Sequence, residues 1–417
     1  MKRVFFFAFT LVVSFIISGC DRLTATVEDL MMLENWDEPQ GYVNPDDLNT
    51  GLPIVRINTV NGKDITNKVD YLTADIKITD PDDSDNDLTT TTEIRGRGNS
   101  SWWNNGKKPY RLKFFEKQKL FGLTKAKSWV LLANATDDTM IRNIIAFEMG
   151  EKFGLPFTNH YVPVELILNG KYRGSYLLTE QVQVGKGRVD IDEDTGYLIE
   201  LDNYYDEEPK FKTAPVPFPV MIKSPETIPN GFGDNFVKTS TNELVGKMFA
   251  DSFPENGYRD LINMDTFVDY IMIQEFLNNT DFWSLNSVYL YKDGEPGSKI
   301  CAGPLWDMDR TLGNPHKRRP ANSDITPLGE VFFGRLFADP VFVAAYKAKW
   351  NEHYDIIATE MPAFIDEMAD KLAQSEKMNY LLWQGTEPED SYYEGIIDDL
   401  KTWWGERVAF MNGAING

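Results

Sequence analysis

Two hydrophobic patterns follow one another along this chain, and their order restricts the folds it can adopt. Residues 52–185 hold short alternating segments such as Pro53–Thr59, the pattern of half-buried strands. Asn169-Gly170 separates two of these segments and is typical of a tight β-hairpin turn. From Met264 the pattern is helical, and Met264–Asn279 is apolar on most faces, as a buried helix is. The order predicts an α+β fold that is mainly β in its first half and mainly helical in its second.

One helix is expected inside the β-rich half, over about residues 139–153, where an amphipathic stretch follows Thr136 and stops at Gly154. In the second half, the same pattern predicts helices over about residues 328–337, 340–357, 361–374 and 391–411. No internal repeat is apparent, so a solenoid or propeller is not expected.

The composition limits the class of partner. The 417 residues are 42% hydrophobic and 13% aromatic, which suffices for a large core in two or three domains. The formal net charge is −22. Because phosphate backbones bind basic surfaces, no nucleic acid partner is expected.

The N-terminus has the pattern of a targeting segment. Lys2 and Arg3 precede the apolar run Val4–Ile17, which is short for a membrane-spanning helix. The closing sequence Ile17-Ser18-Gly19-Cys20 resembles a bacterial lipobox, whose cysteine is lipidated and becomes the new N-terminus. We therefore expect a lipoprotein of the cell envelope, held outside the cytoplasm on a membrane by lipid at Cys20. A plain secretory signal with a coincidental cysteine is the alternative.

Thiol and imidazole chemistry are not expected. Cys301 is the only cysteine besides Cys20, so it has no partner for a disulfide within the mature chain. It lies in an apolar, strand-like stretch, where a thiol packs as a small hydrophobic group. The three histidines are scattered, which disfavours a histidine-rich zinc site.

Three segments carry residues suited to moving a phosphoryl group from ATP. That reaction needs backbone close to the phosphates, a carboxylate that orients the attacking hydroxyl, and oxygen ligands for Mg²⁺. The first segment is a glycine-bearing loop between two expected strands. Its candidate phosphate-binding residues are Gly96, Arg97, Gly98, Asn99 and Ser100. It lacks the third glycine of the full G-x-G-x-x-G motif, so an ordinary tight turn is the alternative.

The second segment follows the buried helix and holds Asp281 and, five residues later, Asn286. Protein kinases place an Asp and an Asn at this interval in their catalytic loop. The aspartate would orient the acceptor hydroxyl and the amide oxygen would bind Mg²⁺. Asn and Asp also gather at helix caps and turns, so a structural role stays open.

The third segment contains Asp307 and Asp309, after a short expected hairpin. In an extended backbone, two residues at this interval point to one side, where their carboxylates form a site for a cation. The alternative is that Asp307 caps the next segment.

Two basic residues and one acidic residue are candidates for positioning the nucleotide. Arg111 and Lys113 share one face of an expected strand, and either cation can reach phosphates. Glu148 lies on the apolar stripe of the helix over 139–153, where a carboxylate is costly unless paired. We expect Lys113 to pair with it, as a strand lysine pairs with a helix glutamate in kinases. A rim position at which Glu148 reaches water is the alternative.

These segments resemble the spore-coat CotH kinase family over roughly residues 52–350. The resemblance is carried by Ile94–Trp102, Lys107–Phe114, Lys127–Asn134, Arg142-Asn143, Tyr176–Gln181 and Gly303–Asp309. Members of this family are atypical kinases, and the studied ones phosphorylate Ser and Thr of secreted or coat proteins. The resemblance implies ATP, Mg²⁺ or Mn²⁺, Asp281 as the catalytic aspartate and Asp307 as a metal ligand.

With this resemblance, we expect an atypical kinase-like fold of two lobes. The expected order is a signal over 1–20, a tether over 21–50, a β-rich N-lobe over 51–185, a family-specific insertion over 186–260 and a helical C-lobe over 261–417. Glu180 and Gln181 would lie at a hinge beside the adenine. The expected activity is phosphorylation of Ser or Thr in surface or secreted proteins. A surface adhesin without turnover and an AMP-transferring enzyme are the alternatives.

Overall fold

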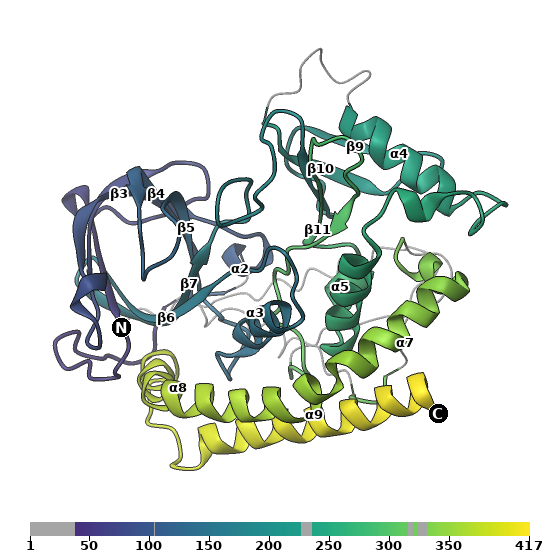
Figure 1. Ribbon diagram of the computed structural model, residues 1–417. Coiled ribbons are helices and arrows are strands. Elements are labelled where there is room, and N and C mark those ends of the chain that lie inside the picture. Colours follow the sequence, from purple (N-terminus) through teal and green to yellow (C-terminus); the bar gives the residue numbers. More distant parts are fainter. Residues whose placement is uncertain (1–37, 104, 227–235, 316–319, 324–331) are drawn as a thin grey trace, which may run out of the picture.

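Seven strands from the first half of the chain close into a barrel, which lies at the left of Figure 1. The computed structural model describes residues 38–103, 105–226, 236–315, 320–323 and 332–417. The barrel strands, in the order in which they pair, are β1 (Ile54–Thr59), β2 (Leu72–Thr79), β3 (Leu88–Gly96), β4 (Tyr110–Gln118), β5 (Ala126–Leu132), β7 (Lys171–Glu180) and β6 (Tyr161–Leu168). Neighbouring strands are antiparallel except β1 and β6, whose parallel pairing closes the barrel. Asn169-Gly170 is the β6–β7 turn, as predicted.

The barrel interior is filled by one face of each strand. Its core includes Ile57, Ile76, Leu112 and Trp129, each at most 1% exposed. Alternation along β2, where Ala74, Ile76 and Ile78 are buried between exposed neighbours, produces this inward face. Because the sheet closes on itself, the barrel leaves no unpaired edge between β1 and β6.

A second, antiparallel sheet lies beside the barrel. Its strands, in spatial order, are β12 (Cys301–Ala302), β11 (Val288–Lys292), β8 (Tyr197–Leu201), β10 (Pro219–Ser224) and β9 (Lys210–Lys212). Strands β8, β9 and β10 come from the segment that we expected to be an insertion, and β8 pairs directly with β11. Cys301 is half-buried against the core, and burial raises the pKa of its thiol.

Helices form most of the described second half, and the helices predicted over about 340–357, 361–374 and 391–411 are present. The one predicted over about 328–337 lies partly outside the described residues, and its described part contains a 3₁₀ turn. The α-helices of the described residues are α2 (Ser100–Trp103), α3 (Arg142–Lys152), α4 (Phe236–Met248), α5 (Met264–Phe276), α6 (Thr280–Trp283), α7 (Pro340–Asp355), α8 (Met361–Gln384) and α9 (Tyr392–Asn416). Short 3₁₀ or π turns lie at Val60–Gly62, Ser84–Asn86, Tyr258–Asp260, Gly334–Ala338 and Ile356–Glu360. The α8 helix runs ten residues beyond the predicted end because Gly385, in a left-handed conformation, supplies its C-terminal cap.

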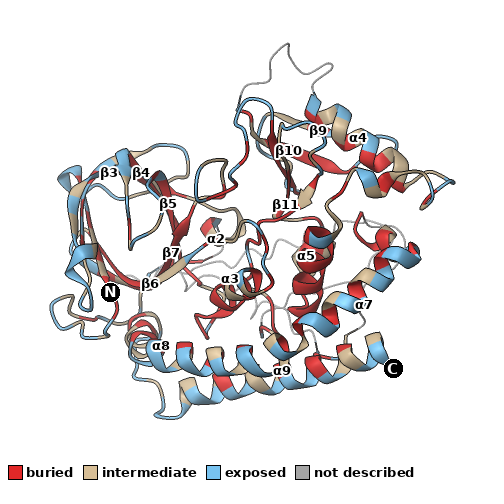
Figure 2. Cartoon of the chain, viewed as in Figure 1, coloured by how far each residue is buried: buried red, intermediate tan, exposed pale blue. Residues whose placement is uncertain are grey.

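The α5 helix is the centre of the helical region. Every residue from Thr266 to Phe276 is buried, which confirms the prediction of a buried helix, and Figure 2 shows α5 red beyond its first turn. Helices α8 and α9 lie against one another along one side and expose their outer faces. The α8 helix also packs on β7, which joins the barrel to the helical region.

The N-terminal predictions fall largely outside the described residues. The signal segment, Cys20 and most of the tether belong to residues 1–37. Residues 38–50 contain turns without helix or strand, and Val43 is buried beside Leu382 of α8. Among the described residues, no helix has the length and apolar character needed to cross a membrane.

Candidate active site

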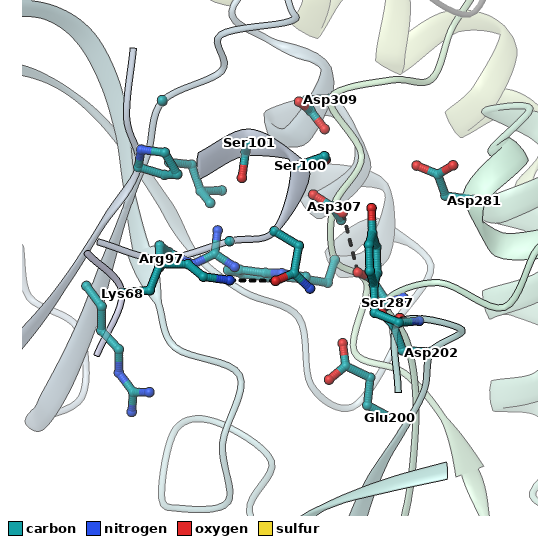
Figure 3. A pocket seen from close by; sticks show the side chains of 18 of the residues that line it. Lys68, Arg97, Ser100, Ser101, Glu200, Asp202, Asp281, Ser287, Asp307 and Asp309 are labelled. Carbon is teal, nitrogen blue, oxygen red and sulfur yellow. Dashed lines mark hydrogen bonds between the residues drawn. The ribbon is translucent and has the colours of Figure 1, made fainter. Parts of the chain in front are cut away.

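A pocket of about 340 Å³ lies where the barrel, the second sheet and two loops meet. The loops span residues 281–287 and 307–310. Figure 3 shows that cationic side chains lie on its barrel side and that carboxylates face them. We call Lys68, Arg95, Arg97 and Arg111 the basic wall, and Glu200, Asp202, Asp281, Asp307 and Asp309 the acidic wall; all of them line the pocket.

The glycine-bearing loop leaves β3 and borders the pocket. A side chain at Gly96 would collide with the Trp102 ring, and Gly98 has a φ of +83° that disfavours other residues. Trp102 donates its backbone N–H to Asn99, and the Asn99 side chain accepts a hydrogen bond from the Lys68 ammonium at 2.7 Å. These contacts hold Arg97, Gly98, Asn99 and Ser100 along one edge of the pocket, whereas Gly96 is not among the described residues that line it.

Arginines dominate the basic wall. Arg95 and Arg111 lie directly opposite each other on β3 and β4, and the Nε atom of each is buried without a protein partner. Like charges facing each other across two strands are unfavourable. Burial, together with Arg95 and Arg97, lowers the pKa of Arg111. An anion in the pocket would neutralise this repulsion.

Arg97 reaches from the glycine-bearing loop toward the acidic wall. Its guanidinium lies 5.3 Å from the centre of the Trp306 ring. Burial lowers the pKa of Arg97, while Asp307 and nearby acidic groups act in the opposite direction. Arg97 therefore carries positive charge to the place where the two walls meet.

Asp281 is presented by a short turn at the end of α5. Asn279 caps α6 by accepting the backbone N–H of Asp281 at 3.0 Å, so Asn279, rather than Asp281, is the capping residue. The Asp281 carbonyl accepts the backbone N–H of Asn286 at 2.9 Å, which closes the loop. This geometry leaves the half-buried Asp281 side chain in the pocket lining.

Asp307 and Asp309 lie on the second loop and both line the pocket. Although the Asp307 side chain is exposed to the pocket, desolvation by the surrounding protein raises its pKa, with Arg97 opposing and Asp281 reinforcing the effect. Burial and the charge of Asp307 raise the pKa of Asp309 to about 6. The charge of Asp281 acts on Asp307, and the charge of Asp307 acts on Asp309, so a cation between Asp307 and Asp309 would relieve this repulsion.

The second sheet contributes two further carboxylates and a lysine. Glu200 and Asp202 lie two residues apart at the end of β8, and burial raises the pKa of Asp202 to about 6. Lys223 of β10 lies 3.1 Å from Glu200 and also pairs with Glu207. Burial alone would lower the pKa of Lys223, but these two carboxylates outweigh it and raise the pKa. Lys223 is therefore a charged lysine inside the pocket.

The predicted pair of Lys113 and Glu148 is wrong. Glu148 accepts a hydrogen bond from the Tyr161 hydroxyl at 2.7 Å and lies 3.7 Å from Lys152. Lys113 is exposed over the Tyr71 ring, and within the described chain it lies outside the pocket lining, whereas Arg111 is part of it. The register explains the difference, because β4 places Lys113 opposite Glu93 and Arg111 opposite Arg95.

Two other predicted residues are engaged away from the pocket. Asn286 accepts the backbone N–H of Asn203 at 3.3 Å, and Glu180 accepts the backbone N–H of His160 at 2.9 Å. The hydrogen bond with Glu180 raises the pKa of His160, although burial opposes this shift. Neither Asn286 nor Glu180 is among the described residues that line the large pocket, whereas Gln181 is.

Sequence reasoning missed Lys68, Arg95, Glu200, Asp202 and Lys223. One signal was available. Glu200 lies inside the apolar segment Tyr197–Leu201, and Asp202 follows that segment, two residues after Glu200. This is the interval that identified Asp307 and Asp309. Arg95 lies next to Gly96 in the motif Ile94–Trp102, which was a second signal, whereas nothing in the segments around Lys68 and Lys223 distinguishes these two lysines from other surface lysines.

The acidic wall has the ligand chemistry of a magnesium site. Mg²⁺ in phosphoryl-transfer sites is bound by one or two carboxylates, together with phosphate oxygens and water, rather than by an all-protein cage. Asp307 and Asp309 meet that requirement. Among the described residues, no three His, Cys, Asp or Glu side chains are gathered closely enough to form a metal site by themselves.

Comparison with known proteins gives one family. The family model of the CotH kinase protein matches residues 94–411, which is most of the chain and includes both walls of the pocket except Lys68. No curated protein matches the chain significantly.

Proposed function

The chain belongs to the CotH kinase protein family, and from this premise we propose that it transfers the γ-phosphoryl group of ATP to Ser or Thr hydroxyls of proteins. The observation that carries the proposal is the meeting of Asp281, Asp307 and Arg97 in one pocket, beside the glycine-bearing loop. These three side chains come from segments far apart in the sequence. In the proposed reaction, Asp281 would orient the acceptor hydroxyl, Asp307 would bind the cation and Arg97 would bind the phosphoryl group.

The division of charge in the pocket suits a nucleotide triphosphate bound with a divalent cation. The phosphates are anionic and favour the basic wall, where Arg95 and Arg111 have buried Nε donors without a protein partner. The acidic wall would repel the same phosphates unless a cation lay between them. A magnesium or manganese ion bound by Asp307 and Asp309 would stabilise the charge on the transferring group.

Asp281 is the proposed catalytic residue. Its carboxylate would accept the proton of the acceptor hydroxyl while that oxygen bonds to the γ-phosphorus and the bond from phosphorus to the ADP oxygen breaks. Arg97, close to Asp307 and Trp306, would hold the transferring phosphoryl group. Arg111 takes the nucleotide-binding role that we expected for Lys113, because it is the one of the two that lines the pocket.

We extend the proposal to architecture and location. The barrel region and the helical region would act as the two lobes of a kinase-like fold, with the nucleotide between them. The lipobox-like sequence Ile17–Cys20 supports attachment of the mature chain to a membrane, outside the cytoplasm. Incorporation of labelled fatty acid by the wild type, and its loss in Cys20→Ser, would test the anchor.

The activity is tested with residues 21–417, ATP labelled at the γ-phosphate, Mg²⁺ or Mn²⁺, and a protein extract as acceptor. We expect labelled protein with the wild type, and none with Asp281→Asn or Asp307→Ala. Equal labelling by all three proteins would overturn the site assignment. Failure of the wild type to bind ATP would favour a surface protein without turnover.

The mass added to the acceptor identifies the group that is transferred. Phosphorylation adds roughly 80 Da to a serine or threonine, whereas transfer of AMP adds roughly 329 Da. Mass spectrometry of the labelled acceptor therefore separates the proposed kinase from an AMP-transferring enzyme with the same fold.

A further inference from the structure

The loop that carries Asp307 and Asp309 is held from the barrel side by the segment 134–143, which joins β5 to α3. Residues 303–308 are neither helix nor strand, and Asp307 has a φ of +63°, a conformation that non-glycine residues adopt infrequently. The loop therefore depends on outside contacts for its shape. Four hydrogen bonds between the segment and this part of the chain provide them. Two lie at the carboxylates: Met308 N donates to Asn143 Oδ1 at 2.9 Å, and Thr136 Oγ1 donates to Asp309 Oδ2 at 2.6 Å. Two lie just beyond them: Arg142 Nε donates to Thr311 O at 2.9 Å, and Asn314 Nδ2 donates to Thr136 O at 2.6 Å.

Asn143 is the best placed of these residues. It lies in the first turn of α3 and is 3% exposed. Its Nδ2 donates to Asn134 Oδ1 at 3.0 Å, and Asn134 Nδ2 donates to Met140 O at 3.3 Å. Because its amide nitrogen is committed to Asn134, the amide oxygen of Asn143 faces the backbone N–H of Met308.

The contact with Met308 acts on both neighbouring carboxylates. Met308 is fully buried, whereas Asp307 and Asp309 on either side of it face the pocket. Holding the Met308 N–H fixes the peptide plane that follows Asp307. Thr136 holds Asp309 more directly, through one carboxylate oxygen, and so orients the other.

The start of α3 is itself braced. Asp137 is completely buried, accepts the backbone N–H of Arg142 at 2.9 Å and pairs with the Arg142 guanidinium. The same arginine donates to Thr311 beyond the metal-binding carboxylates. At the other end of α3, Lys152 pairs with Glu360, which directly precedes α8 and is not part of the loop.

We propose that Asn143 and Thr136 are positioning residues that set the cation affinity of Asp307 and Asp309, by fixing the loop that bears them. The inference rests on the proposed function, in which these two carboxylates bind the divalent cation. In this arrangement α3 serves the active site through its first turn, and the Glu148 side chain has no part in it. Residues that orient metal ligands from outside typically contribute about 10–100-fold in metal affinity.

The test measures binding of Mn²⁺ alone to the mature chain, by electron paramagnetic resonance and by the rise in unfolding temperature that Mn²⁺ causes. We expect Asn143→Ala and Thr136→Val to weaken Mn²⁺ binding about 10–100-fold. Lys152→Ala, on the same helix, serves as the matched control and should bind Mn²⁺ as the wild type does. A metal-free nucleotide titration should give the same affinity in all four proteins.

The outcomes separate this inference from the proposed function. If the wild type does not bind Mn²⁺, the proposed metal site fails. If the wild type binds Mn²⁺ and both variants bind it equally well, the positioning role is overturned. Should Asn143→Ala fail to fold, Thr136→Val decides the matter, because it is nearly isosteric and removes only the hydroxyl contact with Asp309.

Discussion

Asp202 Oδ2 accepts the backbone N–H of Ser287 at 3.0 Å, and this bond ties the end of β8 to the loop that presents Asp281. The other oxygen of Asp202 accepts the backbone N–H of Tyr204 at 2.7 Å. The Ser287 hydroxyl in turn lies 3.4 Å from Asp307. Asp202, directly after β8, is thus bonded to the 281–287 loop and linked through Ser287 to the 307–310 loop, although it belongs to the segment 186–260 that was expected to be an insertion.

Asp202→Asn should lower kcat for phosphoryl transfer about tenfold or more, with a smaller change in KM for ATP. The reason is that a displaced Asp281 slows the transfer step more than it weakens binding of ATP. An asparagine of the same shape has one oxygen and can accept only one of the two backbone N–H groups. Steady-state kinetics would measure the effect. Glu208→Gln, in the same loop but largely exposed, is the control. Equal kcat in Asp202→Asn and the wild type would refute a positioning role for Asp202.

Lys223→Met should raise KM for ATP about tenfold or more, because it leaves Glu200 and Glu207 without their cation beside the phosphates. Lys113→Met should leave KM within about twofold, since Lys113 lies outside the pocket lining. Titration with a non-hydrolysable ATP analogue would measure the two affinities. If Lys113→Met weakened nucleotide binding more than Lys223→Met did, Lys113 would be the lysine that binds the nucleotide.

Glu148→Ala should leave ATP affinity within about twofold and lower the free energy of unfolding by about 1 kcal/mol, the usual worth of one hydrogen bond. Its carboxylate is bonded to the Tyr161 hydroxyl rather than to a pocket cation. Urea unfolding and nucleotide titration would measure the two quantities. A loss of nucleotide binding comparable to that in Lys223→Met would show that α3 acts through Glu148 after all.

Glu275→Gln should change how stability depends on pH. Burial raises the pKa of Glu275 from the ordinary 4.5 to about 8, although its hydrogen bond from Tyr346 and the charge of Arg407 oppose the shift. The native state therefore holds a proton that the unfolded state releases. The stability contributed by the group is complete below pH 4.5 and is lost as the pH rises through about 8.

Glutamine is neutral throughout this range and keeps an oxygen for the Tyr346 hydroxyl. We therefore expect the unfolding temperature of the wild type to fall, relative to that of Glu275→Gln, between about pH 5 and about pH 8. Thermal unfolding followed by circular dichroism at several pH values would measure the difference. Parallel pH profiles for the two proteins would show that Glu275 does not titrate in this range.

Local sequence was a good guide to the elements and to the acidic residues. Asn169-Gly170 predicted the β6–β7 hairpin, and the apolar stretch from Met264 predicted the buried α5. Asp281, Asp307 and Asp309 were identified from their spacing, and all three line the pocket. Their segments show these features within a few residues, so no knowledge of distant contacts was needed.

The basic wall shows why local sequence was not enough. Arg111 and Lys113 share one face of β4, and sequence could not decide which of them serves the pocket. The pairing register decides it, since Arg111 of β4 lies opposite Arg95 of β3 and Lys113 lies opposite Glu93. Asn286 was misplaced for a similar reason, because its partner Asn203 lies beyond the end of β8, 83 residues away in sequence.

By itself, the sequence determined the kinds of element, their order, the family and the carboxylates suited to binding a cation. Tertiary structure alone decided that β1 closes the barrel on β6, that β8 joins β11, and that Thr136 meets Asp309 across 173 residues. The physical reason is that hydrophobic periodicity and turn chemistry act over a few residues. Contacts between distant segments depend on how whole strands pair and pack, and no short stretch of sequence carries that information.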